Sequence, residues 1–334
     1  MNRSLICAAV FASCLVSGVL WACQSPVFRY ALERWKPGTW QLVVVSSGRL
    51  SREQQLAFEK LQATVVKGLP LRVRHIDLSD AAEPERSFWT KIRERGGKDA
   101  VVVAAMYPDS SAVDQPVASV LPLTLETARE ITSSPAREEL VRRLCAGHSA
   151  VWLFVDSGVQ ETDDAAFLRL QQQLQKEAAR LKLPAAAELL VTEEFLQQVR
   201  IPLMLEFSII RIRQDDMREQ FLLDCLLNSE EDLRGLAEPL AFPVFGRGRV
   251  LYSLAGKGIA AATISDACNF LTGACSCEVK EQNPGFDLLI EADWGQAVGD
   301  KLISSPTPAE KPRPKLLAIP PGRRAVPAAE QTKP

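Results

Sequence analysis

The stretch AVWLFVDSG, residues 150–158, decides how this chain is organised. Six consecutive apolar residues are typical of a strand that is buried on both faces, and the polar turn at 156–158 ends it. A helix pattern follows from Thr162 to Leu183, with apolar residues at helical spacing, and it stops before Pro184. A buried strand that leads directly into an amphipathic helix predicts an α/β sheet.

The same order of elements is predicted on both sides of residue 149. The first unit (39–148) has the order βαβαββα, with its elements at 41–46, 51 onward, 71–78, 84–95, 100–105, 117–123 and 134–147. The second unit (149–302) has elements at 151–155, 162–183, 206–213, 217–233, 244–254, 260–271 and a terminal hairpin between 274 and 291. The sequence therefore predicts an α/β fold of tandem three-layer αβα units.

Two short motifs of the second unit resemble the thioredoxin-like fold. They are Phe242-Pro243-Val244-Phe245 before a hairpin and Gly256-Lys257-Gly258 before the last helix. The resemblance covers about 150–273, with a weaker copy at 40–147. Redox members of that fold carry Cys-x-x-Cys at the first strand-to-helix turn, where a helix N-terminus stabilises a thiolate. Here the two turns read GVQET (158–162) and SGRLS (47–51), so the resemblance implies the fold without dithiol chemistry at the usual site.

The first 22 residues predict export. Arg3 precedes an apolar run at 5–22, as in a secretory signal peptide. Leu20, Ala22 and Cys23 resemble a bacterial lipobox, which implies cleavage before Cys23 and a lipid on Cys23, although Trp21 departs from the pattern. We therefore expect a membrane-anchored protein of the cell envelope that faces the periplasm or exterior. Simple secretion and an uncleaved anchor stay open, because 18 apolar residues reach about 27 Å, nearly the thickness of a bilayer core.

Residues 23–38 are predicted to be a juxtamembrane segment. Phe28, Ala31, Leu32 and Trp35 share one helical face. This pattern favours a short helix packed on the first unit, or an interfacial helix that lies beside the lipid anchor. The segment VFRYALERW (27–35) after Cys23, and the Cys-Ser-Cys sequence near residue 276, also resemble uncharacterised exported proteins of bacteria, a resemblance that implies no activity.

Cys268, Cys275 and Cys277 form the densest cysteine cluster. A disulfide from Cys268 to one of the other two, thiols that are unpaired or paired differently, a Cys-Ser-Cys redox couple and a metal site are the alternative interpretations. The spacing is not the paired C-x2-4-C of zinc sites, and no histidine lies near it. Five cysteines follow Cys23, so lipid on Cys23 would leave at least one of them without an intramolecular partner.

Small polar residues follow three predicted strands, at Ser46, Ser47, Asp109, Asp156 and Ser157. If these strand ends face one edge, they form a ligand crevice of the kind found in open α/β sheets. Otherwise they are ordinary loop residues. The two histidines, His75 and His148, have positions typical of structural residues, and no catalytic residue, metal ligand or cofactor motif is predicted.

Residues 303–334 are predicted to be a disordered tail, since eight prolines fall in the last 31 residues. The tail is basic, and it is either solvated or in contact with an acidic envelope polymer or partner. The net charge of −2 argues against binding to nucleic acid. The function that we infer is an exported lipoprotein acting as a non-enzymatic binding or accessory subunit with a protein partner in the envelope. The alternative is a thiol redox or metal-handling protein that uses Cys275 and Cys277.

Overall fold

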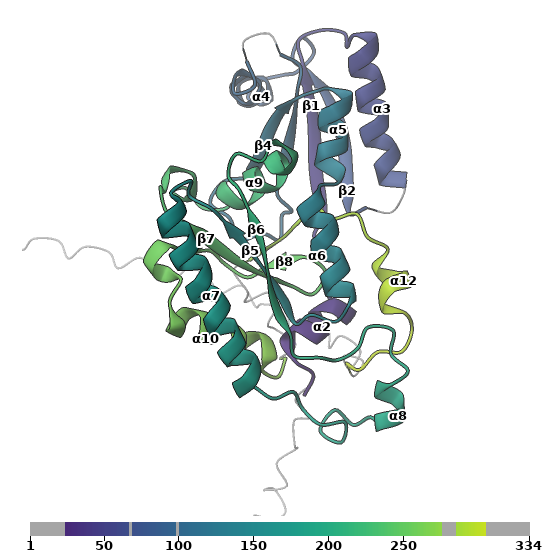
Figure 1. The fold of residues 1–334 in the computed structure, drawn as a ribbon. Coiled ribbons are helices and arrows are strands. Elements are labelled where there is room, and N and C mark those ends of the chain that lie inside the picture. The colour runs from purple at the N-terminus through teal and green to yellow at the C-terminus, as the bar shows by residue number, and fades with distance from the viewer. Residues whose placement is uncertain (1–23, 67–68, 98–99, 276–284, 305–334) are drawn as a thin grey trace, which may run out of the picture.

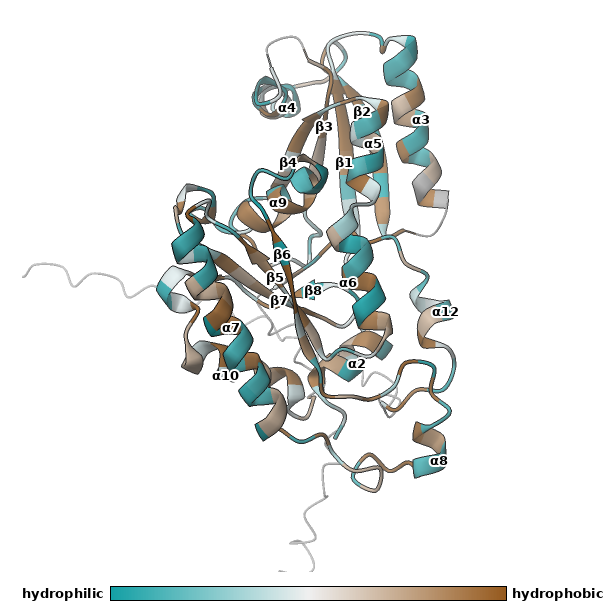
Figure 2. Cartoon of the chain, in the orientation of Figure 1, coloured by the Kyte–Doolittle hydropathy of each residue, from teal (hydrophilic) through white to brown (hydrophobic). Residues whose placement is uncertain are grey.

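The computed structural model describes residues 24–66, 69–97, 100–275 and 285–304 (Figure 1). Two mixed β-sheets, each covered by helices, form the body of the molecule. The predicted α/β class is therefore confirmed. Apolar residues concentrate in the strands, while the outward faces of α3 and α7 are hydrophilic (Figure 2), as expected for sheets that are buried on both sides.

The first sheet has the strand order β2-β1-β3-β4. Its strands are β1 (Trp40–Ser46), β2 (Leu71–Asp77), β3 (Val102–Met106) and β4 (Val117–Pro122). Strand β1 is parallel to β2 and antiparallel to β3, and β3 is antiparallel to β4. One face is covered by α3 (Arg52–Val66) and α5 (Leu125–Thr132), and the other by α4 (Glu85–Glu94). Helix α3 begins with the predicted capping box, in which Gln54 N donates to Ser51 Oγ and Ser51 N donates to Gln54 Oε1.

The second sheet repeats this arrangement with the order β10-β8-β7-β5-β6, and β9 pairs with β7. Its strands are β5 (Ala150–Val155), β6 (Phe207–Ile212), β7 (Leu240–Phe245), β8 (Arg249–Val250), β9 (Leu254–Ala255) and β10 (Phe286–Asp287). Strand β5 is parallel to β6 and antiparallel to β7. Counted within each unit, both sheets have the order 2-1-3-4. The repeated order that the sequence predicts is therefore found in both sheets.

Helices on the two faces of the second sheet come from distant parts of the chain. One face carries α2 (Val27–Arg34), α7 (Gln160–Arg180) and α10 (Ala261–Thr272), and the other carries α6 (Pro135–Cys145) and α9 (Gln220–Leu227). Two short helices, α8 (Glu193–Leu196) and α12 (Trp294–Val298), complete the described part. None of the helices in the described ranges is long and apolar enough to cross a membrane, and residues 5–22 lie outside those ranges.

Helix α9 lies between the two sheets (Figure 1), and its residues from Phe221 to Leu227 are all buried. It packs on β4 and α5 of the first unit although its neighbours in sequence belong to the second. Tyr107 Oη donates to Cys225 O at 2.6 Å, and Ser119 Oγ donates to Asp224 Oδ2 at 2.6 Å. One buried cluster contains side chains of both sheets, such as Leu42 and Leu153. The two units therefore share a hydrophobic core.

Helix α2 is confirmed, but its expected position on the first unit is wrong. It packs against α10 and β7 of the second unit, and residues 25–33 are buried. Arg29 and Glu33, which fall on the polar side of the sequence pattern, form a buried ion pair at 2.6 Å. Glu33 also accepts from the backbone N–H groups of Ile303 and Ser304. The apolar face of α2 is buried against other parts of the protein, so it cannot lie in a bilayer interface.

The segment that follows residue 284 runs between the two units. Phe286–Asp287 pairs with β8, while Ala274 forms a bridge to Pro26. The described ends of the expected terminal hairpin therefore do not pair with each other, and residues 276–284 between them lie outside the described ranges. Trp40 Nε1 donates to Asp287 O at 2.9 Å, which ties the first strand of the protein to this last one.

Candidate functional site

The crevice predicted from the strand ends is not formed, because β3 runs antiparallel to β1. Met106, near the end of β3, lies opposite Gln41 at the start of β1, and Val102 lies opposite Val45. Asp109 therefore lies at the opposite end of the sheet from Ser46 and Ser47. Asp156 and Ser157 follow β5, which belongs to the other sheet.

The turn after β1 is held by its own side chains. Ser46 is buried, and its Oγ lies 2.8 Å from His75 Nε2 on the neighbouring strand. Gly48 N donates to Asp77 Oδ1 at 2.8 Å, and hydrogen bonds from Ser79 and from Gly48 lower the pKa of the Asp77 carboxyl. Ser47 is exposed. These contacts lock the turn that leads into α3.

The turn after β5 is locked in the same way. Asp163, in the first turns of α7, accepts from Ser157 N at 2.8 Å and from Gly158 N at 3.0 Å, which fastens the turn to the helix that follows it. Arg211 on β6 donates to Asp156 at 2.7 Å and also to Asp164. Burial raises the pKa of the Asp156 carboxyl, and the hydrogen bond from Arg211 opposes that shift. Asp156 and Ser157 thus have structural partners within this turn.

Of the predicted cysteine cluster, the structure describes Cys268 and Cys275, whereas Cys277 and the lipidation residue Cys23 lie outside the described ranges. Both described side chains are buried, and no disulfide joins the described cysteines. Burial raises the pKa of the Cys268 thiol to about 12, so that it stays protonated at neutral pH. Groups of acidic, histidine and cysteine side chains that could hold a metal are absent from the described ranges. The described cysteines thus give the redox hypothesis no support, and a bridge to Cys277 stays a prediction.

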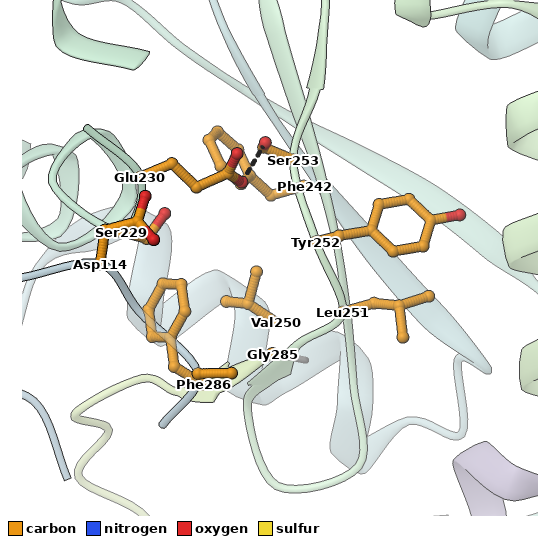
Figure 3. Close-up of a pocket in the computed structure, with 11 residues that line it drawn as sticks. Asp114, Ser229, Glu230, Phe242, Val250, Leu251, Tyr252, Ser253, Gly285 and Phe286 are labelled. Atoms are coloured by element: carbon orange, nitrogen blue, oxygen red, sulfur yellow. Dashed lines mark hydrogen bonds between the residues drawn. The ribbon is translucent and has the colours of Figure 1, made fainter. Parts of the chain in front are cut away.

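A pocket of about 330 Å³ lies at the junction of the two units (Figure 3). We call it the junction pocket. It is built from five segments: the loop between β3 and β4, the residues after α9, β7, the chain from the end of β8 to β9, and the start of β10. The residues that line it are Ala112, Asp114, Ser229, Glu230, Phe242, Val250, Leu251, Tyr252, Ser253, Gly285 and Phe286.

The two loops at the mouth of the junction pocket are fastened to each other. Asp114 N donates to Ser229 O at 3.3 Å, and Glu231 N donates to Asp114 Oδ2 at 3.2 Å. Across the pocket, Ser253 Oγ donates to Glu230 Oε1. A loop of the first unit and two segments of the second therefore form one wall, and the pocket depends on the docking of the two units.

The junction pocket combines an apolar floor with acidic groups. Phe242, Val250 and Phe286 are buried beneath it, whereas Leu251 and Tyr252 point away from the carboxylates in Figure 3. Asp114 and Glu230 carry the only charges among the described residues that line it, and both are acids. Such a lining favours a ligand with a positive charge beside an apolar group.

Sequence reasoning missed this pocket because its residues come from five separate segments. Glycines and acids in loops are individually typical of turns, and no spacing along the chain marks Asp114 as a neighbour of Glu230. The one available signal was the run of three acids at 230–232, separated by two residues from the end of the apolar helix α9.

No protein-family model matches this chain, and no match to it is found among curated proteins. The function is therefore argued from the residues themselves.

Proposed function

We propose that this protein is an exported, lipid-anchored subunit of the bacterial cell envelope that works by binding and not by catalysis. The observation that carries the proposal is the abrupt change at residues 24–25. Gln24 is exposed, whereas every residue from 25 to 33 is buried. Cleavage before Cys23 would leave all of this buried segment in the mature protein and would place the lipid-bearing residue directly beside the folded body.

The junction pocket is the binding site in this proposal. A thioredoxin-like fold would place reactive groups in the turns after β1 and β5. Here the polar side chains of both turns form hydrogen bonds that stabilise the turns. The likeness to that fold is supported by the shared strand order of the two sheets. The structure departs from that likeness at Pro243, which lies inside β7 opposite Trp152.

The ligand class that we propose is a small organic cation, such as an ammonium group attached to an apolar or aromatic group. A volume of about 330 Å³ is at the small end of the range for ligand sites. Glu230 and Asp114 would accept hydrogen bonds from the cation, and Phe286 and Val250 would cover its apolar part. An anion of the same shape would meet two carboxylates and no basic group.

Lipidation is tested first. In a bacterial host we expect a radiolabelled fatty acid to enter the full-length protein, and the intact mass of the membrane-extracted chain to correspond to cleavage before Cys23 plus lipid. Cys23→Ala should abolish the label, because the acceptor thiol is lost. A membrane-extracted chain that retains residues 1–22, or a label that persists in Cys23→Ala, would contradict the proposed anchor.

Ligand binding is tested with three probes of similar shape. By calorimetry we expect the purified protein to bind 2-phenylethylamine more tightly than 2-phenylethanol, and to bind 3-phenylpropionate least. Glu230→Gln keeps an acceptor for Ser253 but removes the charge, so it should weaken amine binding about tenfold, which corresponds to about 1.4 kcal/mol. Glu139→Gln, on the exposed side of α6, is the matched control and should leave affinity unchanged. Equal affinity for the amine and the carboxylate would rule out the cation site.

A further inference from the structure

The chain enters the fold at a single fixed point, immediately after the proposed lipid-bearing residue. Cys275 N donates to Ser25 O at 2.9 Å, and Val27 N donates to Gly273 O at 3.0 Å. Pro26 and Ala274 form the bridge between these two hydrogen bonds. Only Gln24 separates Cys23 from the fixed backbone. Because an extended chain spans at most about 3.6 Å per residue, a connection this short can carry a lipid on residue 23 no further than about 8 Å from Ser25.

The surface around this entry point is the shared end of two long helices. Helices α7 and α10 pack side by side (Figure 1) and end together, where Arg180 Nη2 donates to Asn269 Oδ1 at 2.7 Å. Phe270 lies in the last turn of α10, three residues before Gly273, and it is 36 % exposed. Lys182 is exposed just beyond the end of α7. We call Arg180, Lys182 and Phe270 the anchor-side surface.

We infer that the anchor-side surface lies directly against an anionic bilayer surface. This inference rests on the proposed lipidation of Cys23. A flexible linker would let the body diffuse away from the membrane, but here one exposed residue replaces the linker. A protein surface held against a membrane favours two kinds of group. These are an aromatic ring at the depth of the lipid headgroups and basic side chains beside the lipid phosphates. An exposed basic side chain beside the anchor, here Lys182, also adds attraction to anionic lipids beyond that of the acyl chains.

Among the described residues, acidic groups near the anchor-side surface neutralise part of its charge. Glu177 lies behind it, with its side chain 4 % exposed, and it is already paired with Arg180. Asp266 is exposed one turn further back along α10, away from the chain entry. Of the three residues that form the anchor-side surface, Lys182 therefore carries the positive charge that is not balanced by the Arg180–Glu177 ion pair.

The position of the anchor-side surface also determines the orientation of the second unit. Helix α7 has 21 residues and so extends about 30 Å from the turn at Gly158 to Arg180. Met217 follows β6, which ends beside β5 at that distant end, and it is 70 % exposed. Met217 and Gly158 should therefore point away from the membrane.

The test uses the full-length lipidated chain in vesicles of phosphatidylglycerol and brominated phosphatidylcholine. Brominated chains quench a tryptophan that lies close to the bilayer. We expect Phe270→Trp to add at least about threefold more quenching, relative to the parent protein, than Met217→Trp, since only the first ring would reach the interface. Inserting a flexible twelve-residue Gly-Ser linker after Gln24 should abolish this difference while the protein stays on the vesicles.

The outcomes separate the inference from the proposal on which it rests. A chain that does not stay on the vesicles overturns the proposed anchor. A chain that is anchored but quenches both added tryptophans equally, or neither of them, overturns the docked orientation alone. Quenching of Phe270→Trp that survives the linker would show that the surface binds lipid without help from the short connection, and would overturn the role given to Gln24.

Discussion

Replacement of Arg137 by methionine is expected to lower the free energy of unfolding by about 2 to 4 kcal/mol. The guanidinium is buried between α5, α6 and the segment that follows β10. It donates to Ile131 O at 2.8 Å and to Leu289 O at 3.1 Å, and also to Glu130 O, and it lies 5.1 Å from the centre of the Phe221 ring. Burial lowers the pKa of Arg137 to about 10, so the side chain is still charged at neutral pH. Methionine keeps much of the volume but leaves three backbone carbonyl groups without their donor.

Urea unfolding followed by circular dichroism measures this loss. Arg142→Met is the matched control, because Arg142 lies on the same helix with an exposed side chain paired to Glu139. Exposed ion pairs contribute less than about 1 kcal/mol, so the control should stay near the wild-type midpoint. If Arg137→Met unfolds at the same urea concentration as Arg142→Met, the proposed role of Arg137 in joining the three segments is wrong.

Division of the chain at residue 148 is expected to leave neither half folded. The fragment 149–302 would expose the face of α9 that packs on the first unit, including apolar side chains of the sequence QFLLDCLL. Each Leu or Phe contributes about 1.5 to 3 kcal/mol when fully buried, while a typical domain is stable by only 5 to 15 kcal/mol. The fragment 39–148 would lose the same contacts from its side of the shared core. It would also retain α6, whose packing partners β5 and β6 belong to the other half.

The expected readouts are the absence of a cooperative thermal transition and strong binding of a hydrophobic dye by each fragment. The control is co-expression of the two halves as 24–148 and 149–304, which include α2 and its partners Ile303 and Ser304, because their association should restore the shared core. A cooperative transition in isolated 149–302 would show that the second unit is an independent domain after all.

Strand positions were predictable because several strands here are uninterrupted apolar runs. Both β1 and β5 are almost entirely buried, and such runs need no partner to be recognised. Strand direction was not predictable, since an apolar run reads the same in a parallel and an antiparallel pair. The placement of Asp109 beside Ser46 failed for that reason.

Helix α2 shows a second limit of prediction from the sequence. Its apolar face predicts that another part of the protein covers it, but the sequence pattern does not identify that part. Arg29 and Glu33 read as a solvated face, yet they are buried because they neutralise each other and because Arg29 donates to Ile201 O at 2.7 Å. Helix α5 was missed altogether, although Thr124 caps it by accepting from Thr127 N at 3.0 Å. The junction pocket depends on contacts between segments more than 100 residues apart, and no local pattern reports these.

The contact between Glu33 and Ser304 has a consequence for biosynthesis. The N-terminal helix is the first folded part of the chain to emerge during synthesis or export, yet its buried carboxylate receives two of its donors, from Ile303 and Ser304, only about 270 residues later. The acceptor of the Trp40 Nε1 hydrogen bond, Asp287 O, also comes 247 residues later in the chain. Contacts of such long sequence separation slow folding and keep apolar surface exposed in the meantime. The protein should therefore remain dependent on chaperones until nearly all of it has been synthesised, and truncation before residue 285 should expose it to proteolysis.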